Sequence, residues 1–243
     1  MRFVAQIPVD IECPEQMTAP VQYVLSGEYE SHYSGRDLDI LDIGGNVGSF
    51  SLWANLRWPG SRIHAYEPNP GTFAFFKRNT AGISTITGHN AALFPGAPKR
   101  APFFSRYDGD GEAGLASYAT DTFVPDVVVP QFEVDVVDPA ALKSADIVKI
   151  DIEGGEAEVL ASLDLSGTSL VLLEFQNRRQ RLMMQATLAA AGFDKVVDEE
   201  CPWDPILDYR DYNQSLHGDI YGRMFYVRRG QSKLVRIVPD GAN

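Results

Sequence analysis

The chain has 243 residues, of which 44% are hydrophobic and 22% charged, a composition typical of a globular protein with a sizeable core. Its formal net charge of −12 disfavours a nucleic-acid partner, because polyanion binding draws most of its affinity from a basic surface. No apolar run reaches the roughly 18 residues that span a bilayer, and Cys13 and Cys201 form no metal or disulfide pattern, so we expect a cytoplasmic protein without a membrane partner.

The first 36 residues precede the first strand-like run and contain aromatic and acidic side chains, among them Glu28, Tyr29 and Tyr33. This N-terminal segment could cap a cleft, or it could pack on the core as an added arm. The composition of the segment does not distinguish a cap from a packed arm. We expect residues 37–243 to form one domain, because no Ser/Gly-rich or charge-rich linker divides them.

From Leu38 onward, apolar runs of strand length alternate with helical patterns, which indicates βαβ units and a mostly parallel sheet. Asn69 is expected to cap the second helix, with Pro70 at its first position. The runs 195–197 and 221–227 predict an antiparallel edge. The other predicted strands are 38–43, 62–66, 83–89, 131–136, 147–152 and 169–175, and the predicted helices are 47–58, 70–80 and 179–191.

Between the third of these strands and the strand 147–152 lies an insertion, residues 95–130, rich in glycine, proline and acidic residues. We expect it to project above the carboxyl edge of the sheet, where such a segment either shapes a substrate pocket or forms a surface loop. Its aromatic residues Phe103, Phe104 and Tyr107 could stack on a sugar ring or form a small hydrophobic core.

The turn after the first strand, Asp42-Ile43-Gly44-Gly45-Asn46-Val47-Gly48, distinguishes two kinds of cofactor. A dinucleotide turn presents backbone N–H groups to a pyrophosphate, which an acid at the head of the turn would repel, and Gly-x-Gly-x-x-Gly is absent here. A carboxylate at Asp42 suits a cationic ligand head, such as the amino group and sulfonium of S-adenosylmethionine, although it could instead cap the next helix. Glu67, after the second strand, suits a ribose diol. The turn therefore predicts S-adenosylmethionine rather than NAD.

A second group of acids follows the strand 147–152. Asp151 and Glu153 are two residues apart, so along an extended strand end both would face one cavity. Glu156 is expected in the first turn of the next helix, where a carboxylate complements the helix dipole, and this structural role explains it at least as well as catalysis does. Glu174 ends the following strand.

The chain resembles the FkbM family of S-adenosylmethionine-dependent methyltransferases. The resemblance implies a class I methyltransferase (Rossmann-like) α/β fold, with a seven-stranded mostly parallel sheet, an antiparallel last strand and helices on both faces. Gly45 stands where the family usually has alanine, and the tail after Gln176 departs from the family pattern. The matching pieces are Gly27–Glu30, Asp42–Gly48, Glu67-Pro68, Asn90–Leu93, Gly114–Ser117, Lys149–Glu156 with Val159-Leu160, and Leu173-Glu174.

For the cofactor, we expect the loop and Asp42 to hold the methionine portion, Glu67 the ribose hydroxyls, and Asn90-Ala91 to lie beside the adenine. The general base is expected to be Asp151 or Glu153, with Glu174 and His89 as further candidates that the sequence does not rank. Paired carboxylates could hold a divalent metal, but no metal site is predicted. The candidate cofactor residues are Asp42, Gly44, Gly45, Asn46, Gly48, Ser49, Glu67, Pro68, Asn69, Asn90 and Ala91.

We predict O-methylation of a hydroxyl on a sugar, glycan or small secondary metabolite, with S-adenosylhomocysteine as the product. N-methylation of a small amine or amino sugar is an alternative, because an acidic pocket would attract a protonated amine. A second alternative is a cofactor-binding interaction module whose acceptor site has decayed. Arg178, Arg179 and Arg181 could bind an acidic acceptor or form a solvated helix start. The oligomeric state is not indicated by the sequence.

Overall fold

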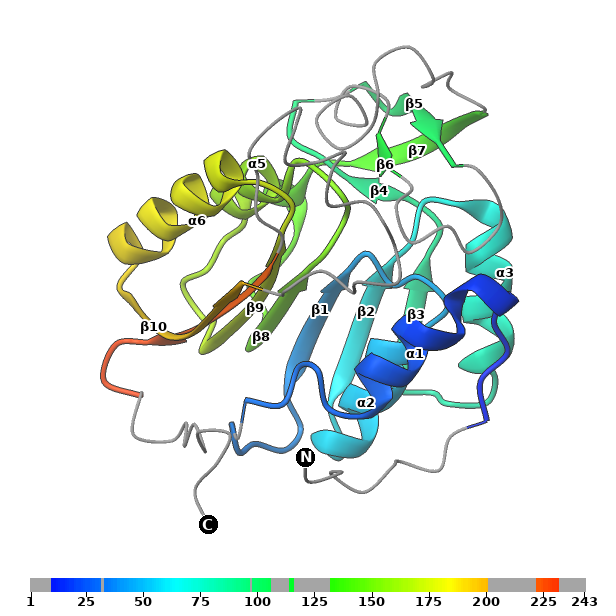
Figure 1. Ribbon diagram of the computed structural model, residues 1–243, viewed down its shortest axis with the longest axis horizontal. Helices are drawn as coiled ribbons and strands as arrows, with labels where there is room; N and C mark the ends of the chain where they lie inside the picture. The colour runs from blue at the N-terminus through cyan, green and yellow to red at the C-terminus, as the bar shows by residue number, and fades with distance from the viewer. Residues whose placement is uncertain are drawn as a thin grey trace.

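A seven-stranded sheet forms the centre of the computed structural model, which describes residues 10–31, 33–96, 98–105, 114–115, 132–200 and 222–231 (Figure 1). The strand order is β10 (Phe193–Glu200), β11 (Gly222–Arg228), β9 (Leu170–Phe175), β8 (Ile147–Ile150), β1 (Asp39–Ile43), β2 (Arg62–Tyr66) and β3 (Ile86–His89). Only β11 runs antiparallel to its neighbours in this sheet. The expected mostly parallel sheet with an antiparallel last strand is confirmed.

Helices cover both faces of this sheet (Figure 1). Alternation along the strands sends Ile40 and Ile147 into an apolar cluster with Phe50 of α2, and sends Leu41 and Val148 into a cluster on the opposite face. Asp42, two residues beyond Ile40, therefore lies on the α2 face. The helices are α1 (Thr18–Leu25), α2 (Ser49–Arg57), α3 (Pro70–Asn79), α5 (Glu156–Ser162) and α6 (Arg178–Ala190), with 3-10 turns η1 (Glu15–Met17) and η2 (Pro139–Ala141).

The cap that was expected at the start of α3 is present. The Asn69 side chain accepts hydrogen bonds from the backbone N–H groups of Gly71 and Thr72, at 3.0 and 3.4 Å, and Pro70 begins the helix. These bonds satisfy N–H groups that have no partner within the helix. The Asn69 amide also donates to Ser105 Oγ at 2.9 Å, which joins α3 to the segment above the sheet.

The described part of the N-terminal segment packs on the core. Tyr29 and Tyr33 are buried in the apolar cluster of the α2 face. Glu30 forms an ion pair with Arg57 of α2, at 2.9 Å, and the Trp58 indole donates to the Tyr33 carbonyl. Of the two arrangements left open by the sequence, these contacts favour a packed arm, and we refer to residues 27–36 as the arm.

The segment after β3 forms a second, four-stranded sheet above the carboxyl edge of the first (Figure 1). Its order is β4 (Ala92–Leu93), β7 (Phe132–Val137), β5 (Arg100–Phe104) and β6 (Gly114–Leu115). The sequence predicted β7 but an irregular chain where β5 lies, because β5 contains Pro102, a residue that normally argues against an inner strand. Phe103 and Phe104 are buried, and Phe103 packs on Phe132 with ring centroids 5.6 Å apart. Expectations for Tyr107, Cys201 and most of residues 106–131 lie outside the described residues.

In the described part of the chain, no helix combines the length and apolar character needed to cross a membrane.

Candidate active site

A cleft opens at the carboxyl ends of β1, β2 and β8, with the second sheet above it. Its empty volume is about 630 Å³, part of which is open to solvent. This is the point where the strand order reverses around β1, the usual ligand position in open α/β sheets. The lining residues are Ile43, Gly44, Asn46, Tyr66, Glu67, Pro68, Ala91, Ala92, Leu93, Phe103, Leu115, Asp151, Ile152, Glu153 and Gly154.

The glycine turn fits closely between two strand ends. The N–H groups of Gly44 and Gly45 donate to the Tyr66 carbonyl, at 3.0 and 2.9 Å, which ties the turn to the end of β2. Gly44 has φ +85°, and a Cβ placed on it would lie 1.7 Å from the Asp151 carbonyl oxygen. Only glycine fits there. At Gly45, a Cβ would approach the side chains of Ala65 and Phe76 at 3.3 Å, so a small residue requires only a slight shift.

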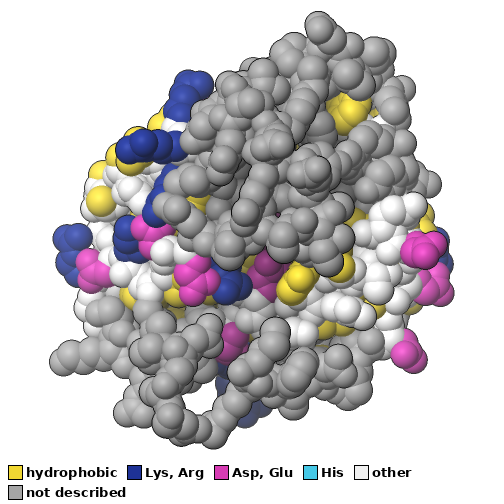
Figure 2. All heavy atoms as spheres, viewed as in Figure 1, with side chains coloured by type: hydrophobic (Ala, Val, Ile, Leu, Met, Phe, Trp, Pro, Cys, Tyr) yellow, Lys and Arg dark blue, Asp and Glu magenta, His cyan; other side chains and the backbone are white. Residues whose placement is uncertain are grey.

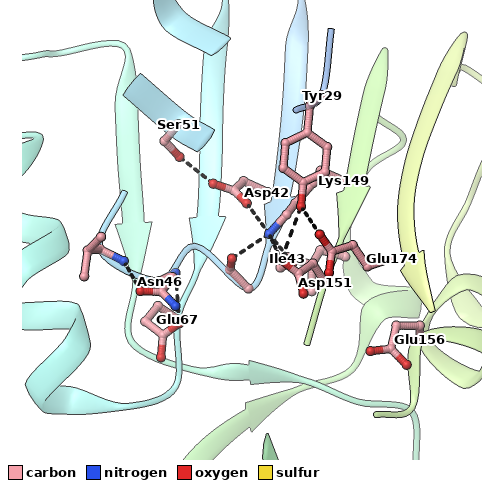
Figure 3. A network of polar contacts seen from close by, with 12 residues as sticks. Tyr29, Asp42, Ile43, Asn46, Ser51, Glu67, Lys149, Asp151, Glu156 and Glu174 are labelled. Atoms are coloured by element: carbon pink, nitrogen blue, oxygen red, sulfur yellow. Dashed lines mark hydrogen bonds and ion pairs between the residues drawn. The ribbon is translucent and has the colours of Figure 1, made fainter. Parts of the chain in front are cut away.

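Lys149 connects this turn to the end of β8 (Figure 3). Its ammonium donates to the Gly44 carbonyl at 2.7 Å and lies 3.3 Å from Asp151 Oδ2 and 3.5 Å from Asp42 Oδ1. The Lys149 side chain is only 3% exposed. Burial alone would lower the pKa of Lys149, but the carboxylates of Asp151 and Asp42 outweigh burial and raise it. A permanent positive charge therefore lies directly behind the cleft.

Asp42 lies behind the cleft rather than in it. Its carboxylate is fully buried, accepts a hydrogen bond from Ser51 Oγ at 2.7 Å and faces Lys149. Burial raises the pKa of Asp42, while Lys149 and Ser51 limit the rise. The expectation that this carboxylate meets a cationic ligand directly does not match its position, because the chain supplies its own cation as the partner. The sequence did not indicate that Lys149, which follows in a distant motif, is the partner of Asp42.

Asp151 and Glu153 both line the cleft, but not for the reason expected. β8 ends at Ile150, and Glu153 has φ +57°, so the two acids do not alternate along an extended strand. The loop after β8 is instead held against the second sheet. A Cβ on Gly155 would lie 2.8 Å from the Phe94 ring, and one on Gly114 would lie 3.2 Å from the Glu153 carbonyl oxygen. This close packing turns the loop toward the cleft.

Glu67 reaches the cleft from the end of β2, opposite the glycine turn (Figure 3). Its carboxylate accepts backbone N–H groups from Asn46 at 3.0 Å and Asn69 at 2.8 Å. Burial raises the pKa of Glu67 to about 7 in spite of these two bonds. Asn90 fixes the adjoining turn by donating to the carbonyls of Glu67 and Pro68, at 2.8 and 2.9 Å.

Some of the candidate site residues line the cleft, and others lie in the turns around it. Gly44, Asn46, Glu67, Pro68, Ala91, Asp151 and Glu153 line the cleft together. Gly45, Gly48, Ser49, Asn69 and Asn90 shape the turns around it: Gly48 precedes α2 with φ +94°, and Ser49 is the first residue of that helix. His89 does not line the cleft but stacks on Tyr66, which does, with ring centroids 4.5 Å apart.

Glu174 and Glu156 do not line the cleft. Glu174 is 6% exposed and accepts a hydrogen bond from the Tyr29 hydroxyl at 3.0 Å. Glu156 is fully buried at the start of α5, where it accepts the Gly154 N–H at 2.8 Å, and burial raises its pKa to about 7. This position supports the structural role for Glu156. The described residues contain no group of three or more His, Cys, Asp or Glu side chains arranged to hold a metal ion.

Figure 2 shows several Lys and Arg side chains over the region of α6. Arg181 pairs with Asp198 of β10 at 2.7 Å, and its guanidinium lies 5.0 Å from the Phe175 ring centroid. Arg178 and Arg179 are exposed at the start of the helix. None of the three lines the cleft. The arrangement agrees with a solvated helix start.

Sequence reasoning assigned no role to Lys149, Tyr66 or Tyr29. Lys149 had one available signal, a lysine within an otherwise apolar strand that carries acids at both ends. Such a side chain must be paired when it is buried. Tyr29 carried two weak signals, its place among acidic residues before the first strand and the resemblance of Gly27–Glu30 to the family.

The model of the methyltransferase FkbM domain matches residues 42–196. Methyltransferase 1 of Beauveria bassiana (strain ARSEF 2860) is 27% identical over 191 residues, which cover 70% of this chain and 77% of that protein. The 31-O-demethyl-FK506 methyltransferase FkbM of Streptomyces tacrolimicus is 25% identical over 155 residues, 51% of this chain and 59% of that protein. Among solved structures, precorrin-6y C5,15-methyltransferase of Geobacter metallireducens GS-15 has a TM-score of 0.43 at 18% identity, covering 80% of this chain and 81% of that one.

Substituting Gly44→Ala should lower the free energy of unfolding by roughly 3 kcal/mol or more, because both the positive φ and the overlap with the Asp151 carbonyl oppose a Cβ. Gly82→Ala is the matched control, since Gly82 has φ +80° with nothing within 4 Å, and it should cost about 1 kcal/mol. Denaturant unfolding measures both variants. Equal losses of unfolding free energy in Gly44→Ala and Gly82→Ala would show that the close approach of Gly44 to Asp151 is unimportant.

Substituting Lys149→Met should destabilise the protein by roughly 3–5 kcal/mol at neutral pH, because it leaves Asp42 and Asp151 without their cation. A buried carboxylate whose folded-state pKa is raised destabilises the fold most when it is ionised. The loss should therefore shrink as the pH falls, and adding Asp42→Asn should recover part of it.

The control for this substitution is Lys195→Met, which removes an ion pair between Asp198 and a lysine side chain that is 42% exposed. It should cost no more than about 1 kcal/mol. Unfolding curves at several pH values measure all three variants. If Lys149→Met loses little stability, or loses more toward acid pH, the pairing of Lys149 with Asp42 and Asp151 is contradicted.

Proposed function

Because the chain belongs to the FkbM family and is an S-adenosylmethionine-dependent methyltransferase, we propose that the cleft binds S-adenosylmethionine and that the enzyme methylates a hydroxyl group of a sugar, glycan or small secondary metabolite. The observation that carries this proposal is the position of Glu67. Its carboxylate enters the cleft from the end of β2 and faces the glycine turn at the end of β1.

The residues around Glu67 fit the cofactor. Two backbone N–H groups occupy part of its carboxylate, and an ionised carboxylate has about four lone-pair sites, so acceptor capacity remains for a ribose diol. Gly44 lines the cleft with its backbone, beside which a methionine portion would pass. Ala91, Ala92 and Leu93 offer an apolar wall for the adenine. Asp42 and Lys149 support the turn from behind.

The bound cofactor would supply a methyl group on a sulfonium, ready for in-line displacement. The chain must then hold the acceptor in line with that methyl group and take the proton from the acceptor hydroxyl. Asp151 and Glu153 line the cleft beside the glycine turn, and the Asp151 side chain is 26% exposed. Phe103 and Leu115 of the second sheet cover the same space and would keep water from it.

A hydroxyl acceptor is favoured by the name of one relative, the 31-O-demethyl-FK506 methyltransferase, which denotes methylation at oxygen. An amine acceptor is the second candidate, because Asp151 and Glu153 line the cleft and would attract a protonated amine. Methyl transfer to matched panels of hydroxyl and amine acceptors separates the two. The described lining of the cleft leaves part of it open to solvent.

The affinity for S-adenosylhomocysteine should depend on pH. Ribose hydroxyls donate to the ionised form of Glu67, and its pKa of about 7 means that this form is scarce at pH 6. The dissociation constant should therefore be about tenfold weaker at about pH 6 than at about pH 8, with proton release on binding. Titration calorimetry in two buffers of different ionisation enthalpy measures both effects.

Glu67→Gln should weaken binding and remove most of this pH dependence. Glu133→Gln, at an exposed carboxylate on β7, is the control and should change neither. Unchanged affinity in Glu67→Gln would refute the assignment of Glu67 to the ribose. Failure of the wild-type protein to bind S-adenosylhomocysteine, together with stabilisation by NAD, would refute the proposed cofactor.

A further inference from the structure

The loop between β8 and α5, residues 151–155, has an unusual backbone conformation. Glu153, Gly154 and Gly155 all have positive φ, at +57°, +123° and +90°. Positive φ is uncommon outside glycine, and a residue such as Glu153 keeps it only where the surrounding structure enforces it. Because this loop carries Asp151 and Glu153 to the cleft, the groups that enforce its conformation also place the two candidate bases.

The two ends of this loop are held by neighbouring elements. The Asp151 N–H donates to the Ile43 carbonyl at 3.1 Å, which ties the first residue of the loop to the end of β1. At the other end, Phe94 packs so closely on Gly155 that a Cβ there would lie 2.8 Å from the ring. The middle of the loop, at Gly154, is held by a different group.

That group is the side chain of Glu156, which reaches back from the first residue of α5 (Figure 3). Its Oε1 accepts the Gly154 N–H at 2.8 Å. The side chain is fully buried, and in the part of the chain that the structure describes its Oε2 has no hydrogen-bond partner. The carboxyl group thus makes its hydrogen bond through Oε1, to the loop that precedes the helix.

A side chain at this position could serve α5 through its charge or serve the loop as an acceptor. The next N–H group of the helix, that of Ala157, does not depend on Glu156, because it donates to Gln180 Oε1 at 2.9 Å. Burial raises the pKa of Glu156 to about 7, although backbone N–H groups, among them that of Gly154, oppose the rise. A negative charge is therefore costly here, whereas the acceptor oxygen is well used.

We propose that Glu156 is a positioning residue, whose acceptor oxygen holds the Gly154 backbone in the conformation that turns Asp151 and Glu153 toward the cleft. This inference rests on the proposed function, because these two acids are the candidate bases for the methyl transfer. Glu156 does not line the cleft itself. It acts through the backbone of the loop, so its loss should affect the placement of the base more than the binding of the cofactor.

Two substitutions separate the acceptor oxygen from the charge. Glu156→Gln keeps an acceptor oxygen at the same reach and removes the charge, whereas Glu156→Asp keeps the charge and shortens the side chain by one carbon. In Glu156→Asp, the Gly154 amide should exchange with deuterium at least about tenfold faster than in the wild-type protein, because its hydrogen bond is lost. In Glu156→Gln, the exchange rate should stay within about threefold of the wild-type rate, because the hydrogen bond is kept.

Nuclear magnetic resonance of the whole protein without ligand, labelled with ¹⁵N-glycine, measures this exchange. The control is Glu158→Gln, at a carboxylate in the same turn of α5 that accepts the Gln180 amide at 3.2 Å, and it should leave the exchange of Gly154 unchanged. Should Glu156→Asp not fold, Glu156→Met, which has a similar length but only a weak acceptor, should show the same fast exchange.

Fast exchange of Gly154 in Glu156→Gln would overturn the proposal, because the charge rather than the acceptor oxygen would then hold the loop. Unchanged exchange in Glu156→Asp would overturn it as well, because a carboxylate serving only the helix start tolerates the shorter side chain.

Kinetics with an identified acceptor test the consequence for catalysis. Glu156→Asp should lower kcat at least about tenfold while the dissociation constant for S-adenosylhomocysteine changes less than about threefold, and Glu156→Gln should retain kcat. Weakened binding with an unchanged kcat would contradict the proposed positioning of the base. If the wild-type protein does not bind S-adenosylhomocysteine, the proposed cofactor is refuted, whereas the hydrogen-exchange result still decides whether Glu156 holds the loop.

Discussion

The buried charge of Lys149 is the interaction on which the rest of the site depends. Its ammonium bonds the carbonyl of Gly44 and lies between the carboxylates of Asp42 and Asp151. A lysine in the middle of a sheet would be strongly destabilising without such partners. With these partners, the Lys149 ammonium links the glycine turn after β1 to the loop after β8. That loop carries Asp151, a candidate base. The two halves of the site are thereby fixed relative to each other.

The pleat of the sheet explains why these groups meet. Asp42 and Lys149 are cross-strand partners in the register of β1 and β8, and Glu174 extends the same face of β9. The apolar residues before them build the core under α2, and the polar residues emerge where the strands end. The arm adds Tyr29 to this face, and the second sheet closes the cleft above it. The proposed cofactor side near Glu67 and the proposed acceptor side near Asp151 would both follow from this one architecture.

Periodicity and turn chemistry were sufficient to predict the alternating strands and helices, the cap at Asn69, the antiparallel last strand and the position of the cleft. They failed where long-range contacts decide the structure. Gly44 and Lys149 are separated by 105 residues, so no local pattern could reveal that Asp42 has an internal cation as its partner. The second sheet includes strands of two residues, too short for alternation to be visible. β8 ends at Ile150, before the end of the expected strand 147–152, and the loop after it packs closely against Phe94.

A crystal structure of the protein with S-adenosylhomocysteine tests the central claim most directly. The account predicts the ribose hydroxyls on the Glu67 carboxylate, the homocysteine portion along Gly44 and Asn46, and the sulfur facing the side of the cleft lined by Asp151, with Lys149 still bonded to the Gly44 carbonyl. A ligand bound away from the carboxyl ends of β1 and β2, or a Lys149 that leaves Asp42 and Gly44 on binding, would contradict it.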